Sequence, residues 1–258
     1  MNSRVSNAIS FQKPGNEQRL KATMRPRDRS PVMYQRWRNL LFLHWSIDPA
    51  VIQATLPKGL FVDTFKERAY LGVVPFFMER VRPRFCPPFP GMSDFLELNM
   101  RTYVLDEIGN PGVWFYSLDA NQRLAVKIAQ TFFSLPYVHA AMSARVERDN
   151  SIVLKSARKA QLPQVFHYKQ LEALPGSKPG TLQFFLAERY LLFSHNKSRG
   201  TLSTGRVHHQ PYPLFSAELR SYSTDLFGLN GFSAPETDPE HVMVSPGVEV
   251  EIFGLQST

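Results

Sequence analysis

Hydrophobic and polar positions alternate along most of this chain in a way that predicts a protein built mainly from strands. Apolar runs such as 40–45 and 70–78 have the length of buried strands and fall well short of the roughly 20 residues that span a membrane. Turn-forming residues separate the segments. Strands are expected over residues 38–45, 60–65, 69–81, 96–106, 113–118, 140–149, 151–157, 184–194, 201–209 and 248–253.

One substantial helix is expected after residue 118. Asp119 and Gln122 have the spacing of a capping box, so the helix should begin near Ala120. Pro136 cannot continue it, and the chain should leave the helix around residues 134 and 135. Five residues recur at helical spacing and should form its buried stripe: Leu124, Ala125, Ile128, Ala129 and Phe132.

Many strands, one principal helix and regular turns indicate a mainly β (α+β) fold, with a curled antiparallel sheet or open β-barrel. A shorter helix is expected over 49–54, with Asp48 as its N-cap and Pro49 at the first position. At 258 residues and 43% hydrophobic content, the chain is long enough for a sizeable single core. We therefore expect one domain over residues 31–258.

The first 30 residues differ from the rest in composition. They hold only Glu17 and Asp28 against seven basic residues, which accounts for about +5 of the formal net charge of +8. Such a segment buries little apolar area and is expected to be a disordered extension. It has no apolar core typical of a targeting peptide, and the basic charge is not accompanied by a nucleic-acid-binding module. No nucleic-acid partner is expected.

The strand expected over 96–106 carries the clearest chemical signal. Strict alternation places Glu97, Asn99, Arg101 and Tyr103 on one face, opposite an apolar face. If the sheet curls, this polar face lines an interior cavity and presents an amide, a guanidinium and a carboxylate to a small organic acid. The alternative is that the polar face meets solvent.

The run 118–140 resembles the acetoacetate decarboxylase-like superfamily, in which a helix is followed by Phe or Tyr, then Pro, then two lysines. Here Leu135 and Pro136 are followed by Tyr137 and Val138, so both lysines are missing. Schiff-base decarboxylation needs a buried amine with a depressed pKa, which neither residue supplies. The resemblance therefore implies the fold without this reaction.

Further segments resemble the YqjF-like proteins, an uncharacterised branch of that superfamily. They are 42–65, 69–78, 97–104, 185–193 and 205–214, in that order. The element at 95–97 is similar to the superfamily's aromatic-x-Glu motif, whose acid lies in the active pocket. The resemblance thus implies a pocket role for Glu97.

Four other positions are candidates for the same site. Tyr137 and His139 follow the helix and are candidate proton donors, with Glu97 as the base. Glu188 is expected to lie inside an apolar strand, where it either pairs with an arginine such as Arg101 or contacts a ligand. His208 is a candidate ligand contact, although the sequence does not decide whether it or the adjacent His209 faces the interior.

Cofactor and metal chemistry have no support in the sequence. The seven histidines lack the spacing of a metal site, and no phosphate-binding glycine loop is present. The single cysteine, Cys86, fits a reducing, cytoplasmic location. Lys127 lies on the polar side of the predicted helix, where a solvated lysine is expected. No cofactor, metal or membrane is expected, and a homo-oligomer is left open.

Three functions of different class remain. The first is a binding protein for a small keto or hydroxy acid. The second is an acid–base enzyme on such an acid, with Arg101 holding the carboxylate and Glu97 moving a proton. The third is a non-catalytic interaction protein, in which the pocket should be filled by side chains.

Overall fold

The computed structural model of the protein describes residues 13–196 and 200–257. Its helices are α1 (Asn16–Thr23), α2 (Pro49–Gln53), α3 (Arg123–Phe133), α4 (Leu182–Ala187) and α5 (Asp225–Leu229). Its strands are β1 (Met33–Ile47), β2 (Leu60–Val62), β3 (Ala69–Pro83), β4 (Phe95–Asp106), β5 (Pro111–Ala120), β6 (Tyr137–Val146), β7 (Ile152–Arg158), β8 (Gln164–Ala173), β9 (Leu191–Asn196), β10 (Thr201–His208), β11 (Phe215–Ser221) and β12 (His241–Ser257). No helix in this part of the chain is long and apolar enough to cross a membrane.

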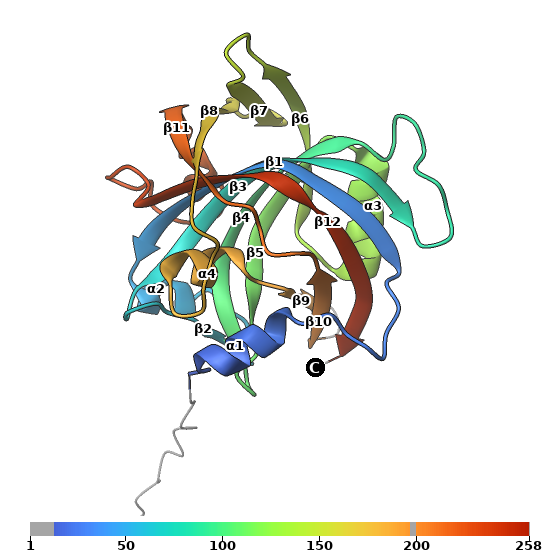
Figure 1. The fold of residues 1–258 in the computed structure, drawn as a ribbon, viewed down its shortest axis with the longest axis vertical. Coiled ribbons are helices and arrows are strands. Elements are labelled where there is room, and N and C mark those ends of the chain that lie inside the picture. The colour runs from blue at the N-terminus through green and yellow to red at the C-terminus, as the bar shows by residue number, and fades with distance from the viewer. Residues whose placement is uncertain (1–12, 197–199, 258) are drawn as a thin grey trace, which may run out of the picture.

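The strands form one large sheet that curls and closes twice (Figure 1). The first barrel consists of β1, β3, β4, β5, β9, β10 and β12, closed by the pairing of β10 with β12. The second barrel runs from β5 through β6, β7, β8 and β11 to β12 and shares β1, β3 and β4 with the first. The expected mainly β fold with a curled sheet is confirmed.

Not every pairing in the sheet is antiparallel. β5 pairs in parallel with both β6 and β9. Parallel neighbours need a crossover connection, and α3 supplies it between β5 and β6. This crossover places α3 beside the first barrel (Figure 1).

Strand β4 is buried on both faces because it belongs to both barrels. Phe95 and Tyr103 pack in the core of the first barrel, whereas Leu96, Leu98 and Met100 pack in the core of the second. All twelve residues of β4 are buried. The polar face of this strand therefore points into the first barrel and not into solvent.

Strands β1 and β3 lie in the same position between the two cores. In β1, Leu40 and Phe42 belong to the first core, while Leu41 and Leu43 belong to the second. A strand with two buried faces has no need of alternation, which explains its uninterrupted apolar run. The prediction that these runs are buried strands is confirmed.

Helix α3 begins later than predicted and ends where predicted. Its N-cap is Gln122, whose side chain accepts a hydrogen bond from the Leu124 amide at 3.1 Å. Asp119 is not the cap, because β5 continues past it and its buried carboxylate pairs with Arg158 at 2.8 Å. Ser134 closes the helix in the left-handed conformation.

The segment 184–194 was expected to be one strand, and this was wrong. Its first part forms α4, capped by Thr181, whose hydroxyl accepts from the Phe184 amide at 3.3 Å. Only the second part forms β9. A short apolar run fits a buried helix as well as a buried strand, so its pattern alone could not decide. The smaller helix α2 begins as predicted, with Asp48 as its N-cap.

The N-terminal extension is ordered where the structure describes it. Arg19 of α1 forms a two-pronged ion pair with the buried carboxylate of Asp63, with both contacts at 2.7 Å. Asp63 also pairs with Arg189 at 2.8 Å. The prediction of a disordered extension therefore does not hold for residues 13–30, because charge pairing replaces the missing apolar contacts. Its first twelve residues lie outside the described part.

Candidate functional site

A cavity of about 370 Å³ lies inside the first barrel. Most of its wall is apolar and comes from β1, β3, β5, α3 and β12, and both of its charged groups lie on β4. The cavity brings together Glu97, Asn99, Arg101 and Tyr137. Among these four predicted site residues, three come from one strand face and the fourth comes from the start of β6.

Glu97 and Tyr137 form a buried pair in this cavity. The Tyr137 hydroxyl donates to Glu97 Oε2 at 2.8 Å, and the Asn99 amide donates to Oε1 at 3.2 Å. Only 3% of Glu97 is exposed, and burial raises its pKa from 4.5 to about 7 despite these two donors. Burial also raises the pKa of Tyr137 well above 10, so the phenol stays protonated. Glu97 is therefore a carboxyl that exchanges its proton near neutral pH.

The crossover through α3 positions Tyr137. Ser134 turns the chain out of the helix, and Pro136 leads it into β6. Tyr137 then lies in parallel register with Leu118 of β5, which itself pairs with Asn99 of β4. The tyrosine thus reaches the polar face of β4 from two strands away.

Arg101 is a buried guanidinium without a carboxylate partner among the described residues. It is 9% exposed, and its side chain lies over the rings of Phe42 and Tyr103 at 5.5 and 5.7 Å. Its Nη2 donates a long hydrogen bond to the Leu186 carbonyl at 3.4 Å, its guanidinium also interacts with the Tyr103 hydroxyl, and Nε has no acceptor. The side-chain oxygen of Asn99 also lacks a donor. Unpaired buried polar groups are costly, so this end of the cavity is chemically incomplete.

Tyr103 shares the face of these residues but does not line the cavity. Its hydroxyl pairs with His44 Nε2 at 2.7 Å, and His44 Nδ1 lies 3.2 Å from Nδ1 of His241. Burial lowers the pKa of His44 well below 6.5 and that of His241 to about 4. Tyr103 therefore contacts a neutral histidine pair beside the cavity, and its role as a ligand contact stays a prediction.

Glu188 pairs with no arginine among the residues that the structure describes, so the ion pair, one of the two roles left open for this residue, is not found there. Its carboxylate accepts from the Tyr190 hydroxyl at 2.7 Å, the Ser177 hydroxyl at 2.9 Å and the Tyr212 amide at 3.2 Å. The residue follows a helix instead of lying within a strand, which turns the neighbouring Arg189 toward Asp63. Because its carboxylate accepts three hydrogen bonds, Glu188 stabilises the loop before β11, and it does not line the cavity.

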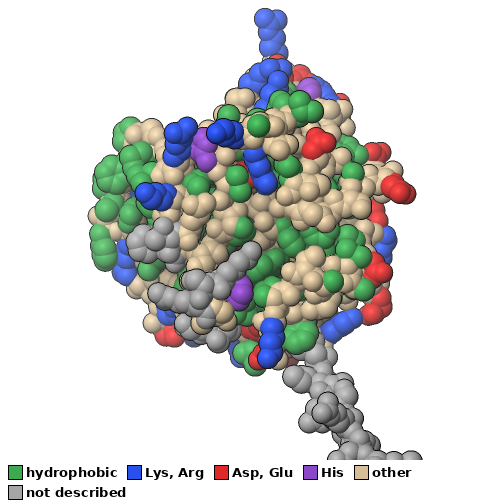
Figure 2. Space-filling view, turned by 180° about the vertical axis from the view of Figure 1, so that it is seen from behind, with side chains coloured by type: hydrophobic (Ala, Val, Ile, Leu, Met, Phe, Trp, Pro, Cys, Tyr) green, Lys and Arg blue, Asp and Glu red, His purple; other side chains and the backbone are tan. Residues whose placement is uncertain are grey.

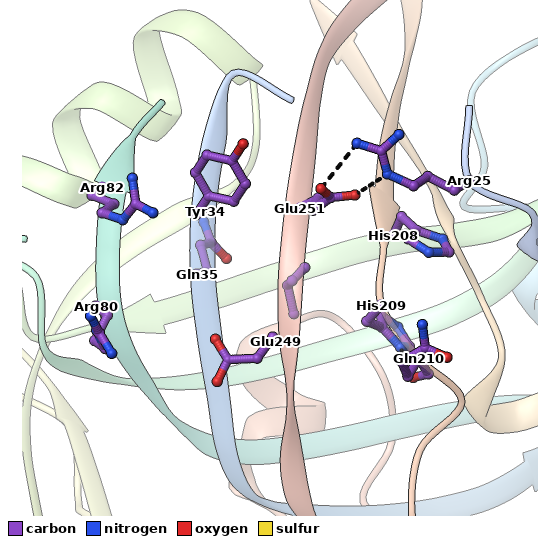
Figure 3. Close-up of a pocket in the computed structure, with 11 residues that line it drawn as sticks. Arg25, Tyr34, Gln35, Arg80, Arg82, His208, His209, Gln210, Glu249 and Glu251 are labelled. Carbon is purple, nitrogen blue, oxygen red and sulfur yellow. Dashed lines mark hydrogen bonds and ion pairs between the residues drawn. The ribbon is translucent and has the colours of Figure 1, made fainter. Parts of the chain in front are cut away.

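Neither His208 nor His209 lines the cavity, and both belong to the wall of an outer groove, where His209 is the buried one of the two. Figure 3 shows His208 beside Arg25 and Glu251 in a shallow outer groove. His209 is buried and stacks on Tyr190, with ring centroids 4.4 Å apart. Burial lowers the pKa of His209 to about 4, so it packs as a neutral ring.

The outer groove is larger than the cavity, at about 550 Å³, but it is the weaker candidate site. Its two acidic groups already have partners: Glu251 pairs with Arg25 at 2.6 Å, and Glu249 pairs with Arg36. It is also open to solvent, which screens its charges. His208 Nδ1 in the groove also lacks a partner, but the cavity holds a buried guanidinium without a carboxylate and an unpaired amide oxygen, so we place the candidate site there.

Two further candidates lie outside the cavity. His139 is exposed on β6, and Lys127 is exposed on α3. Neither residue lines the cavity, and no lysine does so among the residues that the structure describes. The described residues also contain no group of three His, Cys, Asp or Glu side chains that could hold a metal.

Trp37 and Tyr212 are among the cavity-wall residues that the sequence pattern did not predict. Trp37 and Leu40 both line the cavity although they are three positions apart in β1, because a bulge at Asn39, with φ of 51°, shifts the alternation. Tyr212 lies in the loop between β10 and β11, where no periodicity applies. A non-glycine residue at positive φ has no clear sequence signal.

The comparison with known families matches residues 34–249 to DUF2071, described as an uncharacterized conserved protein. This match covers most of the chain. The chain belongs to this family. The uncharacterized protein YqjF of Bacillus subtilis (strain 168) is 37% identical over 210 residues, which cover 81% of this chain and 85% of YqjF. The predicted membership of the YqjF-like family is confirmed.

Solved structures of this fold have very different sequences. The enduracididine biosynthesis enzyme MppR complexed with pyruvate matches with a TM-score of 0.61 at 12% identity, covering 88% of this chain and 91% of its own. Acetoacetate decarboxylase from Legionella pneumophila matches with a TM-score of 0.60 at 12% identity, covering 95% and 96%. The chain shares an acetoacetate decarboxylase-like fold with these two proteins, and at such identity the likeness concerns the fold alone.

The raised pKa of Glu97 predicts a specific dependence of stability on pH. Because its pKa is about 7 in the folded state and 4.5 in the unfolded chain, its stabilising contribution is complete below pH 4.5 and is lost as the pH rises through 7. Over a shift of about 2.5 pH units at about 1.4 kcal/mol per unit, the loss comes to about 3.5 kcal/mol. Urea unfolding between pH 4.5 and 8 should therefore show the wild type losing stability relative to Glu97→Gln.

The exposed Glu107 provides a matched control. Glu107→Gln should follow the wild-type curve throughout. Parallel curves for the wild type and Glu97→Gln would show that the Glu97 carboxyl has an ordinary pKa.

Proposed function

We propose that the protein binds a small organic acid of the keto or hydroxy acid type in the cavity of the first barrel. The observation that carries this proposal is Arg101, a buried guanidinium in the cavity wall with no carboxylate partner among the described residues. A ligand carboxylate would supply the missing charge, because guanidinium and carboxylate match in a two-pronged hydrogen bond. The Asn99 oxygen would accept a hydroxyl or amide proton from the ligand.

The chemistry of the site separates it from lysine-dependent decarboxylation. Tyr137 and Val138 occupy the positions where the superfamily resemblance expects lysines. The relative MppR has been solved with pyruvate bound, which supports a keto acid as a suitable ligand for this fold. We therefore propose binding of a keto or hydroxy acid without Schiff-base formation.

The open volume of the cavity argues against a pure interaction protein. A barrel that only supplies surface has no use for an unfilled interior, since cavities weaken packing.

The lone cysteine, Cys86, is free, which supports the cytoplasm as the location of the protein.

Replacing Arg101 should weaken ligand binding without lowering the stability of the folded protein. Arg101→Met should weaken the affinity for 2-oxobutyrate by about 10- to 100-fold, since a hydrogen bond to a charged group contributes about 1.5–3 kcal/mol. The folded protein should remain as stable as the wild type or become more stable, because an unpaired buried charge is removed. Calorimetric titration and thermal unfolding measure both effects.

Arg189 serves as the matched control, because it is a buried arginine that is paired, with Asp63 at 2.8 Å. Arg189→Met should lower stability by about 3 kcal/mol, since Asp63 loses one of its two partners. Equal affinities of the wild type and Arg101→Met for every keto and hydroxy acid tested would contradict the proposal.

The second candidate is an acid–base enzyme on the same class of acid, and the Glu97–Tyr137 pair favours it. A carboxyl with a pKa near 7 takes up and returns a proton efficiently at neutral pH. In a keto acid, Glu97 would accept the proton from the carbon next to the carbonyl. Tyr137 would hold Glu97 in place by its hydrogen bond.

Such an enzyme would exchange the carbon-bound hydrogen of 2-oxobutyrate with solvent deuterium. Proton NMR in D₂O should show exchange that the wild type accelerates and that Glu97→Gln abolishes, while Glu107→Gln retains it. Borohydride added with the acid should trap no covalent adduct, because no Schiff base forms. Exchange at the rate of the buffer, with the acid bound, would leave the protein as a binder only.

A further inference from the structure

The cavity offers much more space than a keto acid of three or four carbons requires. At roughly 30 Å³ per water molecule, about 370 Å³ holds on the order of a dozen waters. Beyond the polar face of β4, the wall consists of apolar side chains such as Val74, Phe76, Met78, Phe115 and Ile252. Water in such a space finds few hydrogen-bonding partners, so the space suits hydrocarbon better than solvent.

The charged groups Glu97 and Arg101 are buried in the cavity, and most side chains at its outer edge are apolar. We call this edge the rim: Phe89 and Met92 in the loop between β3 and β4, and Leu124 and Ile128 on α3. Met92 is 43% exposed and Leu124 is 45% exposed, in contrast to the buried Glu97 and Arg101.

The two sides of the rim are tied together. The side chain of Gln122, at the start of α3, donates a hydrogen bond to the Gly91 carbonyl at 3.0 Å. Hydrophobic side chains gather along one edge of the molecule in Figure 2, on the side where Figure 1 places α3. An exposed apolar cluster of this kind is typical of a binding surface.

The exposure of the α3 residues in the rim differs from what the sequence predicted. Leu124 and Ile128 were predicted to be buried in the stripe of this helix, yet both are partly exposed. Val126 is buried instead. The apolar surface of the helix is wider than packing requires, and its extra part lines the cavity. The side chains of Ala129 and Phe132 lie outside the described part.

We propose that the natural ligand is a medium-chain aliphatic carboxylic acid, with its carboxylate at Arg101 and its chain extending along the apolar wall to the rim. This inference rests on the proposed acid-binding function and adds that the acid carries an aliphatic carbon chain. Charge selects the head group at the closed end of the cavity, and burial of hydrocarbon stabilises the rest.

The test is a homologous series of saturated acids from butanoate to decanoate, measured by calorimetric titration. Each methylene that enters the apolar space should tighten binding by about fourfold, until the chain passes the rim and the affinity levels off. The matching alcohols, which lack the carboxylate, should bind more weakly at every length. In Arg101→Met, the acids should lose their advantage over the alcohols.

A rim variant separates the chain from the head group. Leu124→Glu should weaken nonanoate binding by about fivefold or more and leave butanoate almost unchanged, because only the longer chain reaches the rim. Leu162→Glu is the matched control, since Leu162 is an exposed leucine that does not line the cavity. It should affect neither acid.

The outcomes distinguish the inference from the function on which it rests. If short keto acids bind in an Arg101-dependent manner but affinity is independent of the length of the ligand's carbon chain, the inference of an aliphatic ligand is wrong and the proposed function stands. If no acid of any length binds, both fail. If Leu124→Glu only dissociates an oligomer and changes no affinity, the rim is an interface between copies of this chain, and the inference is overturned.

Discussion

The double closure of the sheet is the constraint on which the rest of this structure depends. Strands β1, β3 and β4 serve two barrels at once, so each must satisfy a hydrophobic core on both sides. β4 departs from an apolar character on the face toward the first barrel. Three successive inward positions on this face carry Glu97, Asn99 and Arg101. The apolar contacts of the opposite face hold the strand in place and stabilise a polar face that would otherwise prefer water.

The site combines two charges that do not neutralise each other. Burial raises the pKa of Glu97 to about 7, and its donors are Tyr137 and Asn99, not a guanidinium. Arg101 is left with a long bond to a backbone carbonyl and two aromatic rings. A buried charge kept in this state lowers stability, and proteins retain such groups chiefly where a ligand uses them. The same buried region contains Arg189, whose Nη1 pairs with the carboxylate of Asp63 although its Nη2 has no partner. Arg101 differs from it in having no carboxylate partner among the described residues.

The sequence predicted the strand alternation that forms the site but not the surroundings that complete it. The polar face of β4 followed from period-two spacing, and the family resemblance drew attention to Glu97. The burial of that face depends on strand closure over long sequence separations, which local patterns do not encode. Asp119 and Glu188 show the opposite case: capping and strand patterns suggested roles for them, but Asp119 pairs with Arg158, and Glu188 accepts from the Tyr212 amide. Local signals fail where a polar side chain finds a distant partner.

The central claim is that Arg101 receives a carboxylate inside the first barrel. A crystal structure of the protein grown with 2-oxobutyrate tests this most directly. The account predicts the carboxylate within hydrogen-bonding distance of the Arg101 guanidinium, with the carbon chain directed toward α3. An acid bound in the outer groove beside Arg25 and His208, with the cavity free of it, would contradict the account.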